Sequence, residues 1–387
     1  MNIFELDKNY VAPTYGRFDL NIVRGKGSLA YGSDGKEYID LGSGIAVNSF
    51  GFCDDKWIEA VTKQLNTFQH TSNLYYTEPC ALLAKKLCEL TGLSKVFFSN
   101  SGAEANECAI KVARKYACKT LGNDCVIVTL KNSFHGRTLT TLAATGQEAF
   151  HEHFTPLTPG FIHIEPTREE LNRVISEHKV AAVMFEAVRG EGGVLPLTQD
   201  FANALTEAAE KHDILLIADE VQCGNGRSGA YYGYMKLGLT PDVVTTAKGL
   251  GGGLPIGATI LSKKLDDVFS PGLNGSTFGG NPAVCAGALS VLERIDNDFL
   301  ADVEKKSAYI FEAFDGADGV ESISGMGLMI GIKTVKPAKE VVKKAMEKGV
   351  LVLTAKDKVR LLPALNIPMD LLKKAVEILK SICKEDS

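Results

Sequence analysis

Two residues of opposite charge, Asp219 and Lys248, stand where two apolar runs of the sequence end. The run at 214–218 leads into Asp219, and the run at 243–246 leads into Lys248 and a glycine-rich stretch. If both runs are parallel strands, their carboxyl ends meet at the edge of the sheet where open α/β folds bind ligands. A buried lysine there favours its neutral form, which can attack a carbonyl carbon. Each residue alone could equally be a structural ion pair or an exposed turn residue.

An acid paired with such a lysine indicates a particular cofactor, pyridoxal 5'-phosphate. This cofactor needs an acid beside its pyridine nitrogen and a lysine that condenses with its aldehyde. It also needs an anion site, which Gly102 and Ala103 offer because they follow the apolar run 95–99 and begin a predicted helix. Phe134 could cover the cofactor ring, and Arg137 could clamp a substrate carboxylate. Taken singly, these are also an ordinary helix start, a core aromatic and a surface arginine.

A parallel sheet is needed to bring these residues together. Short apolar runs predict its strands at residues 95–99, 125–129, 161–164, 180–185, 214–218, 243–246 and 258–261. Helical patterns lie between several of them, at residues 103–121, 168–178 and 200–211. We therefore predict an α/β fold in which helices cover both faces of a mostly parallel central sheet.

A change in the pattern of elements along the chain predicts two domains. From about residue 271 the alternation of strands and helices gives way to longer helical segments, and residues 1–51 hold glycine-punctuated short strands without a helix between them. We predict a large cofactor-binding α/β domain at 52–270. Residues 1–51 are expected to pack with 271–387 as a small α+β domain.

Composition narrows the classes of protein and of partner. The 387 residues are 45% hydrophobic and 23% charged, which is typical of globular chains and excludes disordered, collagen-like and coiled-coil proteins. A net charge of -5 gives no electrostatic reason for a nucleic-acid or membrane partner. With no membrane-length apolar run and no signal-peptide pattern, we expect a cytoplasmic protein. His151 and His153 lack further nearby ligands, so no metal is expected.

One motif favours a different enzyme class. Residues 224–229 spell G-x-G-x-x-G, the pattern of nicotinamide-binding dehydrogenases. That pattern should open a helix, yet here it runs into Ala230 and Tyr231 and then Tyr232, a poor helix start. A catalytically silent binder on the same fold is a second alternative, although such a protein has no need of Lys248.

Several segments, in order along the chain, carry a family pattern. They are HTSNLYYTEP at 70–79, FSNSGAEANE at 98–107, FHGRT at 134–138, DEVQ at 219–222, the Lys248 segment and STFGGNP at 276–282. With them the chain resembles the class III pyridoxal-phosphate-dependent aminotransferases over nearly its whole length. The resemblance implies a fold-type I transferase that moves an amino group between two substrates.

The resemblance also implies the role of each site residue. Lys248 holds the cofactor covalently and moves the proton, and Asp219 pairs with the pyridine nitrogen. Gln222 contacts the ring hydroxyl, and Thr277 reaches the phosphate of the neighbouring subunit of a homodimer with shared sites. The full set expected to bind the cofactor is Gly102, Ala103, Phe134, Asp219, Glu220, Val221, Gln222, Lys248 and Thr277.

The substrates follow from the same resemblance. It implies N2-acetylornithine as amine donor and 2-oxoglutarate as acceptor, a step of arginine biosynthesis, while ornithine, succinylornithine and 4-aminobutyrate stay alternative donors. Arg137 and Ser276 match positions that bind the acylated donor. Glu191 and Arg360 match an ion pair that closes for the donor, whose reacting carbon bears no carboxylate, and opens for 2-oxoglutarate.

The chain departs from the family pattern in three places. Cys223 replaces the usual threonine after Gln222, which bears only on local packing near the cofactor. Ala187, Val188 and Arg189 replace a common Pro-Ile-Gln stretch, and Asp54 with Asp55 replaces a His-Pro pair. We expect neither of these last two departures to touch the catalytic residues.

Overall fold

A seven-stranded sheet forms the centre of the larger part of the molecule, in a computed structural model that describes residues 2–384. Its strands are β4 (Lys95–Ser99), β5 (Val126–Leu130), β6 (Phe161–Ile164), β7 (Val180–Phe185), β10 (Leu215–Asp219), β11 (Val243–Thr246) and β12 (Gly257–Leu261). They lie in the order β4-β12-β11-β10-β7-β5-β6. β12 runs antiparallel to both of its neighbours, and the other pairings are parallel. The predicted α/β fold is thereby confirmed.

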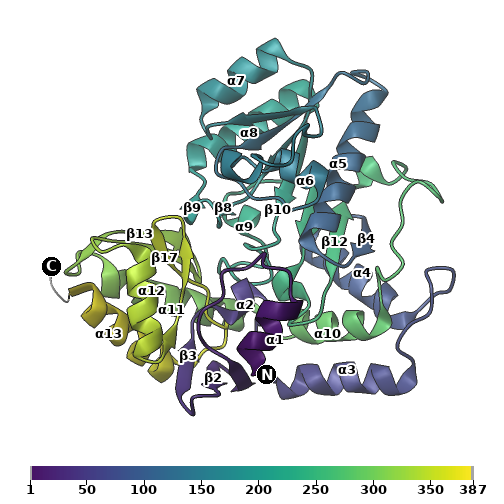
Figure 1. The fold of residues 1–387 in the computed structure, drawn as a ribbon. Coiled ribbons are helices and arrows are strands. Elements are labelled where there is room, and N and C mark those ends of the chain that lie inside the picture. The colour runs from purple at the N-terminus through teal and green to yellow at the C-terminus, as the bar shows by residue number, and fades with distance from the viewer. Residues whose placement is uncertain (1, 385–387) are drawn as a thin grey trace.

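Both faces of this sheet are buried, because helices cover each of them. Alternate residues of β7 and β10 pack against different clusters, so that Met184 and Ile217 lie with helix α5 while Phe185 and Ala218 lie with helix α8. Figure 1 shows α5 and α8 on different sides of the strands. The main covering helices are α5 (Gly102–Cys118), α7 (Arg168–Glu177) and α8 (Gln199–His212).

The N-terminal strands belong to a second sheet that includes a strand from the other end of the chain. Strand β3 pairs in parallel with β15, with Ile39 opposite Val350. This pairing supports the prediction that residues 1–51 pack with the C-terminal part. The strands of this sheet are β1 (Ile22–Lys26), β2 (Leu29–Gly32), β3 (Glu37–Asp40) and β15 (Val350–Leu351).

A third sheet lies beside it and is covered by helices on its outer side (Figure 1). Its strands are β13 (Val320–Met326), β14 (Met329–Thr334), β17 (Lys358–Leu361) and β16 (Leu353–Ala355). The helices are α11 (Asn297–Phe314), α12 (Ala338–Glu347) and α13 (Met369–Lys384). Their apolar faces form one buried cluster with Ile39 and Leu41, so the N-terminal strands share this core.

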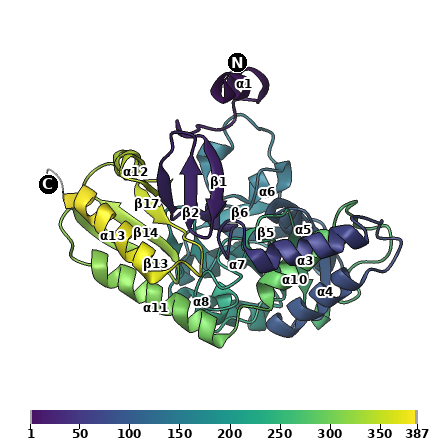
Figure 2. The same ribbon diagram turned by 90° about the horizontal axis from the view of Figure 1, so that it is seen from below.

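Helix α10 (Pro282–Leu292) packs instead with the large sheet. It lies against α3 (Asp55–Thr67) and α4 (Glu78–Thr91), and Figure 2 shows α3 crossing it. A domain boundary at residue 271 therefore stays a prediction.

The remaining elements are short. They are α1 (Ile3–Tyr10), α2 (Ser43–Ala46), α6 (Leu139–Ala144), α9 (Gly233–Lys236), β8 (Val188–Arg189), β9 (Leu195–Pro196) and the 3-10 turns η1 (Glu148–Phe150), η2 (Lys248–Leu250) and η3 (Lys263–Leu265). No helix within residues 2–384 has both the length and the apolar character needed to cross a membrane. The expected cytoplasmic location stays a prediction.

Candidate active site

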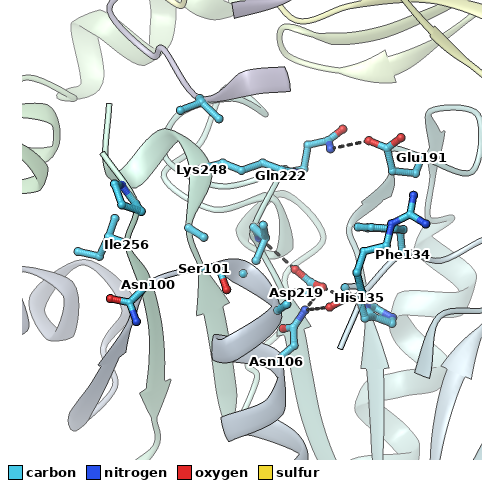
Figure 3. Close-up of a pocket in the computed structure, with 18 of the residues that line it drawn as sticks. Asn100, Ser101, Asn106, Phe134, His135, Glu191, Asp219, Gln222, Lys248 and Ile256 are labelled. Atoms are coloured by element: carbon cyan, nitrogen blue, oxygen red, sulfur yellow. Dashed lines mark hydrogen bonds and ion pairs between the residues drawn. The ribbon is translucent and has the colours of Figure 1, made fainter. Parts of the chain in front are cut away.

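A cavity of about 440 Å³ opens at the carboxyl ends of strands β10 and β11. These strands are parallel neighbours with Asp219 opposite Thr245, so Asp219 and Lys248 reach the same edge of the sheet. Figure 3 shows Lys248 and Gln222 along one side of the cavity and Asp219 along the opposite side. Of the predicted site residues, those that line it are Gly102, Ala103, Phe134, Arg137, Glu191, Asp219, Val221, Gln222 and Lys248.

The carboxylate of Asp219 is buried and held by three donors. One oxygen accepts hydrogen bonds from His135 Nδ1 at 2.7 Å and Asn106 Nδ2 at 2.8 Å, and the other accepts one from the amide of Val221 at 3.1 Å. Asn106 is fixed in turn, because its side-chain oxygen accepts from Thr245 Oγ1 at 2.7 Å. The orientation of the acid is therefore set by its neighbours before any ligand binds.

Sequence reasoning missed His135 and Asn106 as site residues. Both line the cavity, and both lie inside quoted family motifs, which was the only signal available. Burial opposes protonation of His135, but the hydrogen bond and charge of Asp219 outweigh it and raise the pKa of His135. The contact with Asp219 therefore makes His135 easier to protonate than its burial alone would allow.

Lys248 is half-buried at the first position of the short turn η2, which follows β11. Its desolvation lowers the pKa of the amine, and the charge of Arg360 adds to this effect, while Glu191, Asp219 and Glu186 oppose it. The net lowering favours the neutral amine, which is the form that can attack a carbonyl or accept a proton.

Glu186 is a further buried acid that the sequence did not single out. Its carboxylate accepts hydrogen bonds from the amide of Phe134 at 2.8 Å and the amide of Gly190 at 3.4 Å. Burial raises the pKa of Glu186 to about 7, with the charge of His135 acting in the opposite direction. Glu186 thereby fixes the backbone of Phe134, whose ring lines the cavity.

Glu191 and Arg360 form an ion pair beside Lys248. Arg360 Nη1 lies 2.6 Å from Glu191 Oε1 and 3.3 Å from Gln222 Oε1, and the Gln222 amide donates to Glu191 at 3.3 Å. Burial alone would raise the pKa of Glu191, yet the charge and hydrogen bond of Arg360 lower it. The structure thus brings together two residues that are 169 positions apart in the sequence.

The start of helix α5 offers an anion site. The side chain of Ser101 caps the helix by accepting from the amide of Glu104, and within residues 2–384 the amides of Gly102 and Ala103 find no acceptor. A Cβ on Gly102 would lie 2.6 Å from Val221 Cγ1, so only glycine fits there. Two free amides at a helix N-terminus that lines the cavity fit a phosphate group.

Four predicted residues do not line this cavity. Arg360 is one of them and pairs with the lining residue Glu191, and the others are Glu220, Ser276 and Thr277. The side chain of Glu220 accepts from the amides of Gly233 (2.7 Å) and Tyr234 (2.8 Å), and burial raises its pKa to about 8. Ser276 accepts from Asn100 Nδ2 at 3.1 Å and lines a separate hollow beside residues 70–77, while Thr277 is exposed. The prediction that Glu220 contacts the cofactor therefore lacks support from its position.

This fold and site define an aminotransferase: the chain belongs to the class-III aminotransferase family, whose sequence pattern matches residues 10–383. Its similar relatives include the acetylornithine aminotransferase of Haemophilus ducreyi, 48% identical over 99% of this chain and 98% of the relative. That of Methanocaldococcus jannaschii is 42% identical over 99% of this chain and 98% of the relative. The predicted family resemblance is confirmed.

Solved structures agree with this assignment. An ornithine aminotransferase from Toxoplasma gondii superposes with a TM-score of 0.94 at 28% identity, covering 98% of this chain and 94% of that one. An acetylornithine aminotransferase from Elizabethkingia anophelis gives 0.87 at 29% identity, covering 99% and 98%. The protein is therefore a pyridoxal-phosphate-dependent transaminase of fold type I.

Proposed function

We propose that this enzyme transfers the δ-amino group of N2-acetylornithine to 2-oxoglutarate, reversibly, giving N-acetylglutamate 5-semialdehyde and glutamate. The relatives named acetylornithine aminotransferase support it, since those reported above are 42 to 48% identical over nearly the full chain. The observation that carries the proposal is the ion pair of Arg360 with Glu191 beside Lys248. In this pair Arg360 can bind a substrate carboxylate, and Glu191 neutralises the arginine when the bound substrate has no carboxylate at that position.

Residues of the cavity fit the cofactor from end to end. Gly102 and Ala103 would donate their free amides to the phosphate, Phe134 would cover one face of the ring, and Asp219 would pair with the pyridine nitrogen. Gln222 contacts the ring hydroxyl. When bound, pyridoxal phosphate supplies an electron sink for the negative charge that develops when the reacting carbon loses a proton.

Lys248 performs the proton transfer. The lowered pKa of its amine favours the neutral form, which would accept the proton from the carbon that bears the reacting nitrogen and deliver it to the carbon on the other side of that nitrogen. Asp219 is held in a fixed orientation by its three donors and would face the pyridine nitrogen of the bound cofactor. Arg137 lies at the cavity with its guanidinium 4.4 Å from the centre of the Phe150 ring, which holds its plane for a distal carboxylate.

A comparison of amine donors tests the proposed function. We expect kcat/KM to be highest for N2-acetylornithine in steady-state assays run beside ornithine, succinylornithine and 4-aminobutyrate. A higher value for any of the other donors would reassign the substrate. A purified protein with no visible absorbance band that borohydride removes, and no transfer, would contradict the transaminase assignment itself.

The Glu191→Ala variant is expected to slow the amine-donor half-reaction by about tenfold or more and to leave the 2-oxoglutarate half-reaction nearly unchanged. Without Glu191, Arg360 stays an uncompensated buried cation beside a carbon without a carboxylate, which forfeits a charge-assisted hydrogen bond. Single-turnover absorbance spectroscopy measures each half separately.

Glu165→Ala is the matched control for this change. Glu165 is a half-exposed acid that pairs with Lys131 at 3.3 Å, outside the cavity. It should leave both half-reactions unchanged. Equal slowing of the two halves by Glu191→Ala would show that the ion pair does not separate the substrates.

We further propose a homodimer whose sites are shared. Thr277 is exposed, and an apolar surface beside it presents Leu74 (87% exposed), Tyr76 (106%) and Phe278 (60%). The two segments that carry these side chains are tied together, since Asn73 Nδ2 donates to the carbonyl of Ser276 at 3.0 Å. A large exposed apolar patch of this kind favours a protein partner.

Mixed dimers of two inactive variants should recover activity. Thr277→Asp places a negative charge against the partner's phosphate and is expected to weaken cofactor binding by about 100-fold or more. A dimer of one Thr277→Asp chain and one Lys248→Ala chain keeps one intact site. Co-expression with two affinity tags isolates it, and its activity is measured at limiting cofactor. No recovery, or a monomer by light scattering, would rule out shared sites.

A further inference from the structure

The backbone of Lys248 adopts an unusual conformation for a residue with a side chain. Its φ of 43° lies in the left-handed region, which a lysine occupies at a cost. Such a conformation persists only where the surrounding structure over-determines it. The neighbours of Lys248 must therefore contain the groups that hold it.

Alternate carbonyl groups around Lys248 are each bound by a side chain from a distant segment. Ser49 and Trp57 come from the N-terminal part, and Asn225 comes from the loop 224–229 that spells the nicotinamide-like motif. The hydrogen bonds are Asn225 Nδ2 to Ala247 O at 3.3 Å, Ser49 Oγ to Gly249 O at 3.0 Å, and Trp57 Nε1 to Gly251 O at 3.0 Å.

Trp57, the one tryptophan of the chain, is itself fixed at its other end. Its amide donates to Asp54 Oδ1 at 2.9 Å, where Asp54 caps helix α3. Asp54 also pairs with Arg294 Nη1 at 2.8 Å, and Arg294 lies 3.8 Å from the centre of the Phe50 ring. We expected the replacement of the family's His-Pro pair at Asp54 to leave the catalytic residues untouched. Asp54 is linked to the turn that begins at Lys248 indirectly, through Trp57.

Two glycines make room for the indole. A Cβ on Gly252 would lie 2.9 Å from Trp57 Nε1, and a Cβ on Gly287 of helix α10 would lie 2.9 Å from the same atom. Gly252 also has a φ of 59°, which favours glycine. The glycine run after Lys248 thus serves, in part, to admit this side chain.

We propose that Trp57 is a positioning residue for Lys248: with Ser49 and Asn225 it holds the flanking carbonyls so that the lysine backbone stays left-handed and its amine enters the cavity. This inference rests on the proposed role of Lys248 as the cofactor-linked residue. Gly251 is buried, so loss of the indole N–H leaves its carbonyl short of one donor.

The Trp57→Phe holoenzyme tests the proposal, because phenylalanine keeps a ring in place and removes the N–H. We expect bound pyridoxal phosphate to be lost about fivefold faster into a scavenging apoenzyme, as one lost hydrogen bond implies. We also expect weaker visible circular dichroism of the cofactor, since that signal depends on how the lysine orients it.

Val61→Ala is the matched control. Val61 is a buried residue of the same helix that packs beside Gly287, and its apolar side chain has no hydrogen bond to donate to the Lys248 turn. It should lower the Tm and leave both cofactor signals as in the unchanged enzyme. Ser49→Ala removes a single oxygen and should reproduce the effects of Trp57→Phe. If Trp57→Phe does not fold, Ser49→Ala alone tests the proposal.

Unchanged cofactor loss and dichroism in Trp57→Phe and Ser49→Ala would overturn the positioning role, even if both variants melt earlier. Failure of the underlying function looks different. In that case the unaltered protein itself would carry no borohydride-fixed cofactor on the peptide that contains Lys248.

Discussion

Lys248→Ala is expected to reduce amino-group transfer by about 10,000-fold, the upper end of what a positioned acid-base group contributes. The variant loses both the covalent link to the cofactor and the buried amine that moves the proton. Single-turnover absorbance measurements with the donor follow the loss directly. Mass spectrometry after borohydride reduction should find no cofactor on the peptide that spans this position.

Lys131→Ala is the control for that experiment. Lys131 is about half exposed and pairs with Glu165 at the surface, so its loss should leave transfer unchanged. If Lys248→Ala retained a substantial rate, another amine would have to serve as proton carrier, and the assignment of the site would be wrong.

Asp219→Asn is expected to lower kcat by about 100- to 1,000-fold, the range for removing one preorganised electrostatic partner. Asparagine has nearly the same shape but no negative charge. It would also turn an amide toward donors from His135, Asn106 or Val221, which now converge on the carboxylate. Steady-state kinetics at saturating pyridoxal phosphate separates this loss from weaker cofactor binding.

Asp242→Asn provides a matched comparison on the same sheet. Asp242 accepts a hydrogen bond from the amide of Leu216 at 3.1 Å and lies just before strand β11, at the sheet edge opposite the cavity. We expect that variant to lose stability and keep its kcat. If Asp219→Asn had a kcat close to that of the unaltered enzyme, the proposed pairing of Asp219 with the pyridine nitrogen would be contradicted.

The edge of the sheet that carries the site was predictable from hydrophobicity. The runs ending at Asp219 and Lys248 are fully buried strands, and parallel pairing brings their ends together. The bounds of the first of these strands differ by one residue from the predicted ones, because backbone pairing rather than apolar character decides where a strand ends. Asp219 itself pairs with Thr245 and so belongs to β10.

The groups around Asp219 could not be predicted in the same way. Asn106 and His135 lie 113 and 84 positions from it, and neither follows a periodic pattern. Their roles arise from tertiary contact, because a buried carboxylate needs donors from whichever elements pack against it. Glu186 was missed for the same reason.

The position of Glu220 was open to a better prediction. Successive side chains of an extended chain point to opposite sides, so the neighbour of an inward-pointing Asp219 should point away. Glu220 does so and binds the amides that begin α9. The DEVQ motif led us to group Glu220 with Asp219 because the two are adjacent in sequence, and this alternation of side chains was left out of account.

The pairing of strand β3 with β15 has a consequence for biosynthesis. Ile39 of β3 pairs with Val350 of β15, so the outer edge of β3 leaves the ribosome long before its partner strand is made. Contacts between such remote segments slow folding, and an unpaired strand edge is open to association with other chains in the meantime. We therefore expect the outer edge of β3 to stay unpaired in nascent chains until synthesis is almost complete.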